Sequence, residues 1–210
     1  MDPIVVIGGG GHAKVVLSIL HKLNKYQILG YSDLRDNGVL LAVDYIGSDQ
    51  VLTSMAAKWT RLNAVLAIGQ VGLGKARQEL LARLQSLSLS FPSIVSPDSV
   101  LNEEVRIGDG VTVMDGVVIN SGTLIGRGAI VNTNSTVEHD VRIDDWVHIA
   151  PGVTISGGVT IGRFSMIGAG ATVIEGKQIA SECIVGAGAT VVHDLTEPGV
   201  YVGTPARRIR

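Results

Sequence analysis

The sequence predicts a two-part fold: a small α/β unit with a parallel sheet over residues 1–92, followed by a parallel β-solenoid over residues 93–210. Two observations support this fold class. Every sixth residue from Val95 to Val191 is Ile, Val or Leu without interruption, which is the mark of an internal repeat. Ahead of the repeat, short apolar runs typical of strands alternate with helical patterns, and a glycine-rich turn follows the first run.

The N-terminal unit is predicted to alternate strands with helices, an order that favours a parallel sheet. Its first strand runs directly into the turn Gly8–Gly11, and Asp49 is expected as the N-cap of the second helix. The predicted elements are, in order, a strand at 4–7, a helix to about 23, a strand at 27–31, a helix from 49 to about 58, a strand at 64–68 and a helix from 74 to about 87.

The six-residue repeat predicts the shape of the second part. Because six is an even number, the same side chains point inward in every hexad of an extended backbone. A short strand and a sharp turn form one flat side of a coil, and three sides close a triangular coil. The span from Val95 to Val191 then gives about 5.3 stacked coils. The third residue after the aliphatic position is often Gly or Asn, which tolerate positive φ at a tight corner.

Composition and charge disfavour several classes of protein. The formal net charge is −2, the pI is near 6.2 and 46% of the residues are hydrophobic, which argues against disorder and against a nucleic-acid-binding surface. The single cysteine, Cys183, excludes a disulfide framework. No apolar run reaches the length of a membrane span, and no basic region opens the chain. We expect a soluble cytoplasmic protein without nucleic-acid or membrane partners.

The glycine-rich turn suggests a nucleotide site. Gly8-x-Gly10-x-x-Ala13 fits the dinucleotide fingerprint, and Asp33 follows Ala13 at the distance of a ribose-binding carboxylate. Glycines let a phosphate approach the backbone, and the helix N-terminus supplies N–H groups and partial positive charge. The candidate substrate-binding residues at this edge of the sheet are Gly10, Gly11, His12, Asp33, Leu34 and Gly69. A tight turn without a ligand is the alternative, and a full NAD site is disfavoured because a second half-domain is missing.

The combination of motifs resembles a known family. The turn Gly8–Ala13, the hexads with Glu138-His139-Asp140 and His148, and the closing Gly203–Ala206 are similar to the bacterial sugar O/N-acyltransferases. These include sialic acid O-acetyltransferases and nucleotide-amino-sugar N-acetyltransferases. The resemblance implies a left-handed β-helix, acetyl-CoA as the donor, and a homotrimer with active sites between subunits. It also implies that the N-terminal unit holds the nucleotide-sugar.

The resemblance also implies roles for two histidines. His139 is expected to be the catalytic base, and Asp140 stands where the family often has a glutamate. His148 is expected to contact acetyl-CoA. A neutral imidazole with a neighbouring carboxylate suits a general base near pH 7, although a solvated polar corner is the alternative for His139. The two histidines fall on different sides of the coil, so they can form one site only if a neighbouring subunit supplies one of them.

Further candidates concern the cofactor. Gly157, one coil from His139, is expected to offer an N–H to the thioester oxyanion, and Ala169 and Ala187 lie on small-residue edges of the kind that hold the pantetheine arm in this family. Cys183 occupies an inward position and is expected to be a core thiol, which favours direct transfer. Trp146 is expected as a subunit contact or a wall of the substrate cleft. No metal site is expected.

These observations favour an acetyl-CoA-dependent N-acetyltransferase that acts on the amino group of a UDP- or GDP-linked amino-deoxy sugar in bacterial surface glycan synthesis. An O-acetyltransferase of the sialic acid type would use the same base and is the first alternative. A nucleotide-binding scaffold without catalysis is the second alternative.

Overall fold

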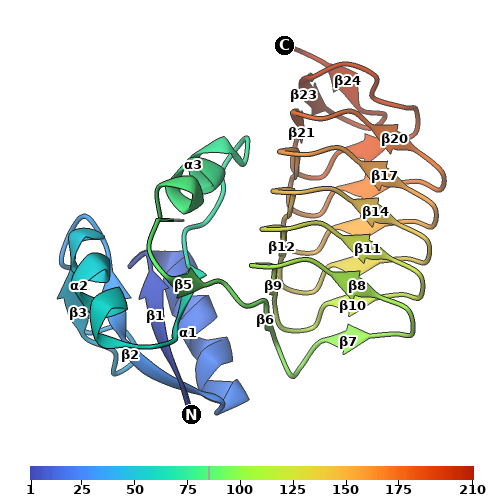
Figure 1. Ribbon diagram of the computed structural model, residues 1–210. Coiled ribbons are helices and arrows are strands. Elements are labelled where there is room, and N and C mark those ends of the chain that lie inside the picture. The colour runs from blue at the N-terminus through green and yellow to red at the C-terminus, as the bar shows by residue number, and fades with distance from the viewer. Residues whose placement is uncertain (85) are drawn as a thin grey trace.

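The computed structural model describes residues 1–84 and 86–210, which form the two parts that the sequence predicts (Figure 1). The first part is a parallel sheet of order β3-β2-β1-β4-β5, covered by helices α1 to α3. The second is a stack of triangular coils with three parallel sheets along its sides. The predicted division at residues 92 and 93 falls between the last strand of the first part and the first strand of the second.

The strands of the N-terminal sheet are β1 (Asp2–Ile7), β2 (Tyr26–Ser32), β3 (Tyr45–Gly47), β4 (Leu62–Leu66) and β5 (Leu89–Ser90). Its helices are α1 (Gly11–Leu23), α2 (Gln50–Lys58) and α3 (Lys75–Leu84). Strand β1 pairs in parallel with both β2 and β4, so the apolar central strands are buried between helices. The edge strands β3 and β5 are not predicted from the sequence because they are too short to show a periodic pattern.

Two local predictions are met only in part. Asp49 is the N-cap residue of α2, as predicted, but its side chain makes no capping hydrogen bond. Its carboxylate instead accepts from Ser32 Oγ at 3.1 Å, which ties the helix to the end of β2. The helix predicted to run to about residue 87 ends at Leu84. Gln85, also within that predicted range, lies outside the described residues.

The docking face of the β-helix is the sheet that lies against the N-terminal unit. Its strands are β6 (Ile94–Val95), β9 (Thr112–Val113), β12 (Ile130–Val131), β15 (His148–Ile149), β18 (Met166–Ile167), β21 (Cys183–Val185), β23 (Gly199–Val202) and β24 (Arg207–Arg208). The last of these is antiparallel and closes the end of the stack.

The other two sheets face away from the N-terminal unit. The second face consists of β7 (Val100–Leu101), β10 (Val118–Ile119), β13 (Thr136–Val137), β16 (Thr154–Ile155), β19 (Thr172–Val173) and β22 (Thr190–Val191). The third face consists of β8 (Arg106–Ile107), β11 (Leu124–Ile125), β14 (Arg142–Ile143), β17 (Thr160–Ile161) and β20 (Gln178–Ile179).

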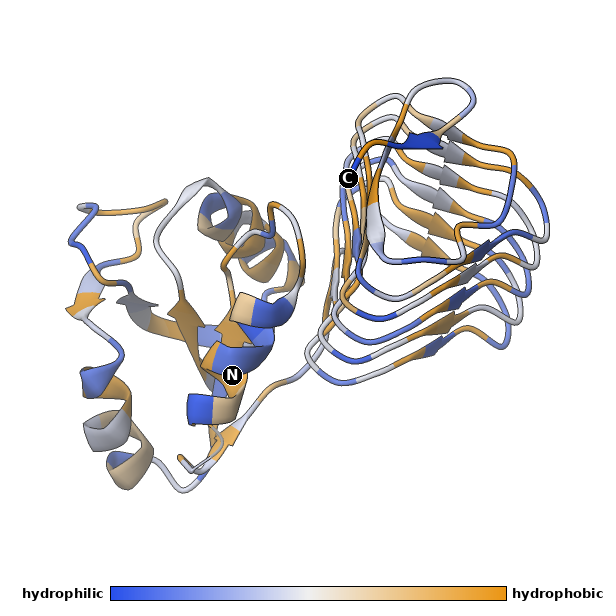
Figure 2. Ribbon diagram, turned by 90° about the horizontal axis from the view of Figure 1, so that it is seen from above, coloured by the Kyte–Doolittle hydropathy of each residue, from blue (hydrophilic) through white to orange (hydrophobic). Residues whose placement is uncertain are grey.

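The strand register confirms the triangular coil. Ile130 pairs with His148, and Thr136 pairs with Thr154, so each residue meets the one a full coil later. The predicted aliphatic positions stack inside the prism, where Ile149, Ile155 and Ile161, one from each face, are all 0% exposed. Apolar burial along these ladders stabilises the stack. The coils are seen nearly end-on in Figure 2.

The N-terminal unit packs directly on the docking face (Figures 1 and 2). Helix α1 contributes to one apolar cluster with Ile94, Met114 and Ile130. At the rim, Lys22 Nζ lies 2.7 Å from Asp98 and 2.6 Å from Asp115. The loop after β4 also meets the docking face, where the Gln70 carbonyl oxygen lies 2.9 Å from His148 Nδ1. The carboxyl ends of the N-terminal strands therefore lie close to the β-helix.

Candidate active site

The four glycines after β1 divide into two pairs with different surroundings. At Gly8, which has φ +117°, a Cβ would lie 2.7 Å from the Ala67 carbonyl oxygen, and at Gly9 it would lie 2.5 Å from the Tyr31 ring. These two glycines are required by packing. At Gly10 and Gly11 no atom lies within 4 Å of a Cβ apart from the adjacent residues and the backbone of α1. The space over the start of α1 is therefore open to a ligand, and the helix N-terminus there favours an anion.

The other predicted nucleotide residues surround this turn. Asp33 Oδ2 accepts from the Gly9 N–H at 2.5 Å, which places the carboxylate beside the turn. Leu34 follows and is 88% exposed. A Cβ at Gly69, after β4, would lie 3.4 Å from His12 Cβ. The structure thus gathers the predicted residues at the carboxyl edge of the sheet, where open α/β sheets bind ligands.

His12 is the innermost member of this group. Burial, together with the charges of Arg77 and the nearby His148, lowers the pKa of its imidazole to about 4. Its Nε2 atom is buried without a hydrogen-bond partner among the described residues. The ring is therefore neutral at pH 7 and lies between the glycine turn and the interior of the domain interface.

His139 and Asp140 form an exposed pair at the corner between the second and third faces. His139 Nδ1 lies 2.9 Å from Asp140 Oδ2. Asp140 has φ +57°, the left-handed conformation of this corner, which turns its carboxylate toward the preceding residue. That hydrogen bond is the main cause that raises the pKa of His139, and the charges of Asp140, Glu138 and Glu175 add to it. The carboxylate accepts the Nδ1 proton, which leaves Nε2 as the basic nitrogen.

Gly157 lies directly beside the ring of His139. A Cβ at position 157 would lie 2.7 Å from both Cε1 and Nε2 of the imidazole. Among the described residues, the Gly157 N–H donates no hydrogen bond, whereas its carbonyl accepts from Gly176 at 2.9 Å. An unshared N–H beside the basic nitrogen is compatible with the predicted oxyanion role.

His148 occupies the docking face and binds the N-terminal unit. Its Nδ1 lies 2.9 Å from the Gln70 carbonyl oxygen, and its Nε2 lies 3.2 Å from Asn132 Nδ2. A carbonyl only accepts, so Nδ1 carries the proton and Nε2 accepts from the amide. Burial lowers the pKa of His148 to about 4. Both ring nitrogens are therefore used by the protein itself.

A groove of about 570 Å³ lies between the loop after β4 and the docking face. Its walls are mainly apolar and include His148, Met166, Ala169, Ala187 and Val71, the last of which is 99% exposed. Three of the predicted cofactor residues, His148, Ala169 and Ala187, thus meet in one groove. Gly157 does not line it, because it lies at a different corner beside His139.

One chain therefore carries two separate groups of candidate residues. The glycine turn and the groove flank the docking face, whereas His139, Asp140 and Gly157 lie at the corner between the second and third faces, after β13 and β16. This separation agrees with the predicted placement of the two histidines on different sides of the coil. Among the described residues no cluster of His, Cys, Asp and Glu could hold a metal ion, and no helix has the length and apolarity to cross a membrane.

Comparisons with known proteins match both parts of the chain. Residues 3–84 match the family model of the PglD N-terminal domain, and residues 122–157 match that of the bacterial transferase hexapeptide. No curated protein gave a match. Among solved structures, PerB from Caulobacter crescentus in complex with CoA and GDP-perosamine is 35% identical, with a TM-score of 0.92 over 100% of this chain and 98% of that chain. The chain belongs to the hexapeptide-repeat family of sugar acyltransferases.

Other members of this family are similar over the same length. The acetyltransferase domain of PglB from Neisseria gonorrhoeae in complex with acetyl coenzyme A is 32% identical, with a TM-score of 0.91 over 99% of both chains. A histidine-to-alanine variant of the GDP-perosamine N-acetyltransferase from Caulobacter crescentus, in complex with CoA and GDP-perosamine, is 34% identical over 100% and 98% of the two chains, with a TM-score of 0.93. The predicted fold class, including the left-handed β-helix, is confirmed.

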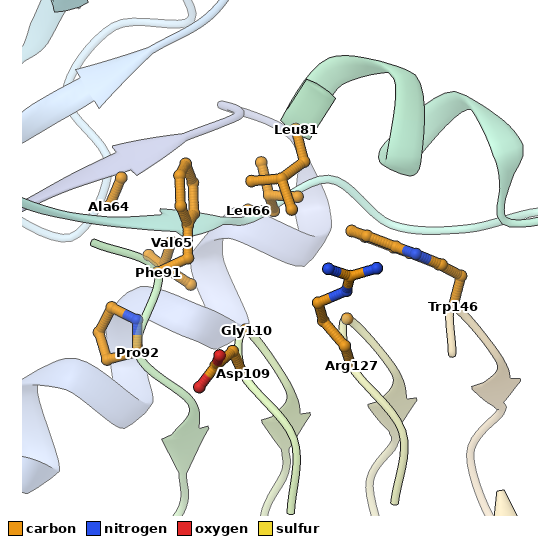
Figure 3. Close-up of a pocket in the computed structure, with 11 residues that line it drawn as sticks. Ala64, Val65, Leu66, Leu81, Phe91, Pro92, Asp109, Gly110, Arg127 and Trp146 are labelled. Carbon is orange, nitrogen blue, oxygen red and sulfur yellow. The ribbon is translucent and has the colours of Figure 1, made fainter. Parts of the chain in front are cut away.

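The packing of the N-terminal unit corrects one of the two expectations for Trp146, that of a subunit contact. This residue has φ +61° at a corner where most hexads carry glycine, and it is 1% exposed. Figure 3 shows its indole beneath Leu81 of α3, beside a cavity of about 30 Å³. Trp146 is thus covered by the N-terminal unit of its own chain and cannot contact another subunit. The sequence marks this position as unusual but does not indicate what covers it.

Two interface residues were not singled out from the sequence. Arg77, on α3, is 3% exposed and donates from Nη1 to the Gly128 carbonyl oxygen at 2.7 Å. Gln70 binds His148 through its backbone carbonyl, a group that every residue possesses. Arg77 lies on the apolar side of the predicted third helix, and a cation at such a position indicates a buried polar contact. Nothing in the sequence marks Gln70.

Proposed function

We propose that this chain transfers the acetyl group of acetyl-CoA to the amino group of a UDP- or GDP-linked amino sugar. The main support is the likeness over the full chain to a GDP-perosamine N-acetyltransferase solved with both CoA and GDP-perosamine. The open glycine turn and the apolar groove have the chemical character that the nucleotide-sugar and acetyl-CoA, respectively, require. The first accepts an anion at a helix N-terminus, and the second accepts an extended apolar arm.

His139 is the proposed general base. The amino group must lose a proton as it attacks the thioester. His139 is exposed, and Asp140 binds its Nδ1, so the neutral ring presents Nε2 as the proton acceptor. The new C–N bond forms as the carbonyl π electrons move to oxygen, and the Gly157 N–H would stabilise the resulting oxyanion. Collapse of this intermediate releases the CoA thiolate, and the proton held by His139 can then protonate the thiolate.

A covalent acetyl-enzyme is not part of this proposal. Cys183 is 0% exposed, and burial raises the pKa of its thiol to about 11, so the thiolate is scarce and enclosed. Direct transfer requires both substrates to be bound together, with the amine within hydrogen-bond reach of the base.

The nucleotide-sugar is proposed to bind at the glycine turn. The diphosphate would lie over Gly10 and Gly11, beside His12 and Gly69, while Asp33 and Leu34 would flank the nucleoside. Acetyl-CoA would occupy the groove formed by His148, Ala169 and Ala187. Because both nitrogens of His148 are already bonded, its contact with the cofactor would be made through the ring carbons.

A homotrimer is proposed for the active assembly. Within one chain, His139 lies at a corner away from the docking face, where the glycine turn and the groove lie. A neighbouring subunit that presents its His139 corner to this docking face would complete the site. Light scattering at micromolar concentration should give the mass of three chains, and a monomer with full activity would refute this part of the proposal.

The deciding experiment is an acetyl-CoA consumption assay against UDP-, GDP- and CMP-linked amino sugars and their hydroxyl analogues. Acetylation of an amine in a UDP- or GDP-sugar, shown by mass spectrometry, is the expected result. Product formed only on a hydroxyl would establish the O-acetyltransferase alternative, and no product on any acceptor would favour the scaffold alternative.

His139→Ala should lower kcat by about 10²–10⁴-fold with little change in KM for acetyl-CoA. A cytoplasmic location stays a prediction.

A further inference from the structure

A buried hydroxyl lies beneath the turn that carries His139 and Asp140. It belongs to Thr123, which is 0% exposed and occupies the inward position one coil before Val141. Its Oγ1 donates to the Glu138 carbonyl oxygen at 2.7 Å and accepts from the Val141 N–H at 3.2 Å. A hydroxyl can donate and accept at the same time. Thr123 therefore joins the residue before His139 to the residue after Asp140.

This hydroxyl takes the place of the turn's own hydrogen bond. In a closed four-residue turn, the last N–H donates to the first carbonyl. Among the described residues the Val141 N–H makes no such bond to Glu138, and both groups bind Thr123 instead. Four corners above an apolar inward residue do close, at 3.0 to 3.4 Å. The closing bonds run from Ala129 to Gly126, Ser135 to Asn132, Ala171 to Gly168 and Ala189 to Gly186, above Val111, Val117, Val153 and Ala171 respectively.

Two further corners have the open form, and each has a serine beneath it. Ser93 Oγ donates to the Gly108 carbonyl oxygen at 2.6 Å and accepts from the Val111 N–H at 3.2 Å. Ser165 makes the same pair of bonds in the turn 180–183, at 3.1 and 3.0 Å. In each of these corners the open form accompanies a hydroxyl, whereas the closed form accompanies an apolar side chain. A serine hydroxyl also suffices to hold a turn open.

The contact between His139 and Asp140 depends on the shape of this turn. Asp140 adopts the left-handed conformation, with φ +57°, and its Oδ2 lies 2.9 Å from His139 Nδ1. Within residues 1–84 and 86–210 no other side chain binds the His139 ring. The ring is exposed, so its place beside Gly157 is set by the backbone of the turn and by Asp140.

We propose that Thr123 is a positioning residue for the reaction: by holding the turn 138–141 open, it places the His139–Asp140 pair against the Gly157 N–H. This inference rests on the proposed function for the role of His139. Thr123 is buried beneath the turn and acts through the backbone on either side of the pair, without touching a substrate.

Thr123→Val tests this role, since it removes the hydroxyl at nearly constant volume. Valine already fills the same position one coil before and one coil after, as Val105 and Val141, so the core accommodates it. We expect the turn to close and kcat to fall about tenfold or more, because a displacement of about 1 Å can lower a rate about 10²-fold. KM for acetyl-CoA should stay within about twofold.

Two variants control for the loss of the hydroxyl. Thr123→Ser should keep most of the wild-type kcat, because Ser93 makes both bonds at its own corner. Ser93→Ala removes the same two bonds from the turn 108–111, which holds none of the candidate residues. This change should leave kcat as it is in the wild type.

The titration of His139 is a readout that a general loss of stability would not move. Loss of the Asp140 bond should lower the pKa of His139 toward its ordinary value, while the charges of Glu138 and Glu175 still raise it. In Thr123→Val the acid limb of kcat should therefore move to lower pH. Spectra of ¹⁵N-histidine-labelled protein without substrate should show the same shift, with His139→Gln to identify the signal. Thr123→Ser should titrate like the wild type.

The outcomes separate this proposal from the proposed function. An unchanged kcat in Thr123→Val would refute the role of Thr123 even if the wild type transfers acetyl groups. A fall in kcat without a shift in the titration, or an equal fall in Thr123→Ser or Ser93→Ala, would refute it as well. If the wild type transfers no acetyl group, a titration that moves in Thr123→Val but not in Thr123→Ser would support Thr123 and leave the reaction refuted.

A second substitution covers a failure of the first to fold. If circular dichroism and light scattering show that Thr123→Val is unfolded, Thr123→Ala takes its place with the same expected results. Alanine fills this position of the hexad at Ala129 and Ala171, both of which are buried in the stack.

Discussion

Replacing Gly157 by alanine should move the ring of His139 without unfolding the chain. An ideal Cβ at position 157 would lie 2.7 Å from both Cε1 and Nε2 of that ring, whereas ordinary contacts begin at 3.4 Å. The ring must therefore shift by about 0.7 Å or rotate away. His139 is exposed at 59% of its side chain, so it can move into solvent at little cost to stability.

The size of the effect on catalysis follows from the geometry. A displacement of about 1 Å of a reacting group can lower a rate about 10²-fold, so we expect kcat to fall by about 10- to 100-fold in Gly157→Ala. The free energy of unfolding should change by less than about 0.5 kcal/mol, since position 157 has ordinary φ and the neighbour that must give way is exposed.

The assay combines steady-state kinetics with thermal unfolding. Ser121→Ala is the matched control, because Ser121 occupies the equivalent corner position one coil to the other side of His139 and should leave kcat unchanged. If the ring also loses its bond to Asp140, the pKa of His139 returns toward its ordinary value, and the acid limb of the kcat profile moves to lower pH. Normal kcat in Gly157→Ala would refute the assignment of this ring as the base.

Three further predictions concern other sites. Asp140→Asn should also shift the acid limb of kcat to lower pH, because the carboxylate is the main cause that raises the pKa of His139; a limb that stays in place would contradict this. Lowering the pH from 7 to 5 should destabilise the fold by about 2 kcal/mol for each of His12 and His148. The unfolded rings bind protons below pH 6.5, whereas the folded rings stay neutral down to about 4; urea unfolding at both pH values measures this, and His148→Gln should remove its share. Gly11→Ala should weaken GDP binding in calorimetry while Tm holds or rises, because alanine suits a helix better than glycine and no atom apart from the adjacent residues and the backbone of α1 lies near its Cβ; equal binding would argue against a ligand there.

The β-helix was predictable from the sequence because its core consists of one position of the hexad, filled in every repeat by Ile, Val or Leu. Once Ile149 and its equivalents point inward, the register, the corners and the faces follow from the period. The place of the glycine turn in the fold was predictable, since Gly10, Gly11 and Asp33 lie at chain positions that follow parallel strands, whereas nucleotide binding there stays a prediction. The edge strands β3 and β5 were not predictable, because two or three residues show no period.

The domain interface was the part that the sequence did not predict. Trp146 adopts the left-handed backbone conformation at its corner, which costs free energy in a bulky residue. Burial against α3 offsets this cost, and only the packed structure reveals that contact. Arg77 lies in a short amphipathic helix, where most cations face solvent. Gln70 contributes a main-chain carbonyl. Each of these features depends on how two separately predictable parts meet.

The packing of the N-terminal unit on the β-helix also explains why the candidate residues fall into two separate groups. The N-terminal unit packs on the docking face at Ile94, Met114 and Ile130, and the groove that remains beside His148 is the one proposed for acetyl-CoA. His139 instead lies at a corner that its own N-terminal unit leaves free, where 59% of its side chain is exposed. A base in that position is of use only to a site whose substrates are held by another copy of the chain. The covered docking face and the free His139 corner are thus two consequences of the same packing, and together they favour an active site assembled between subunits.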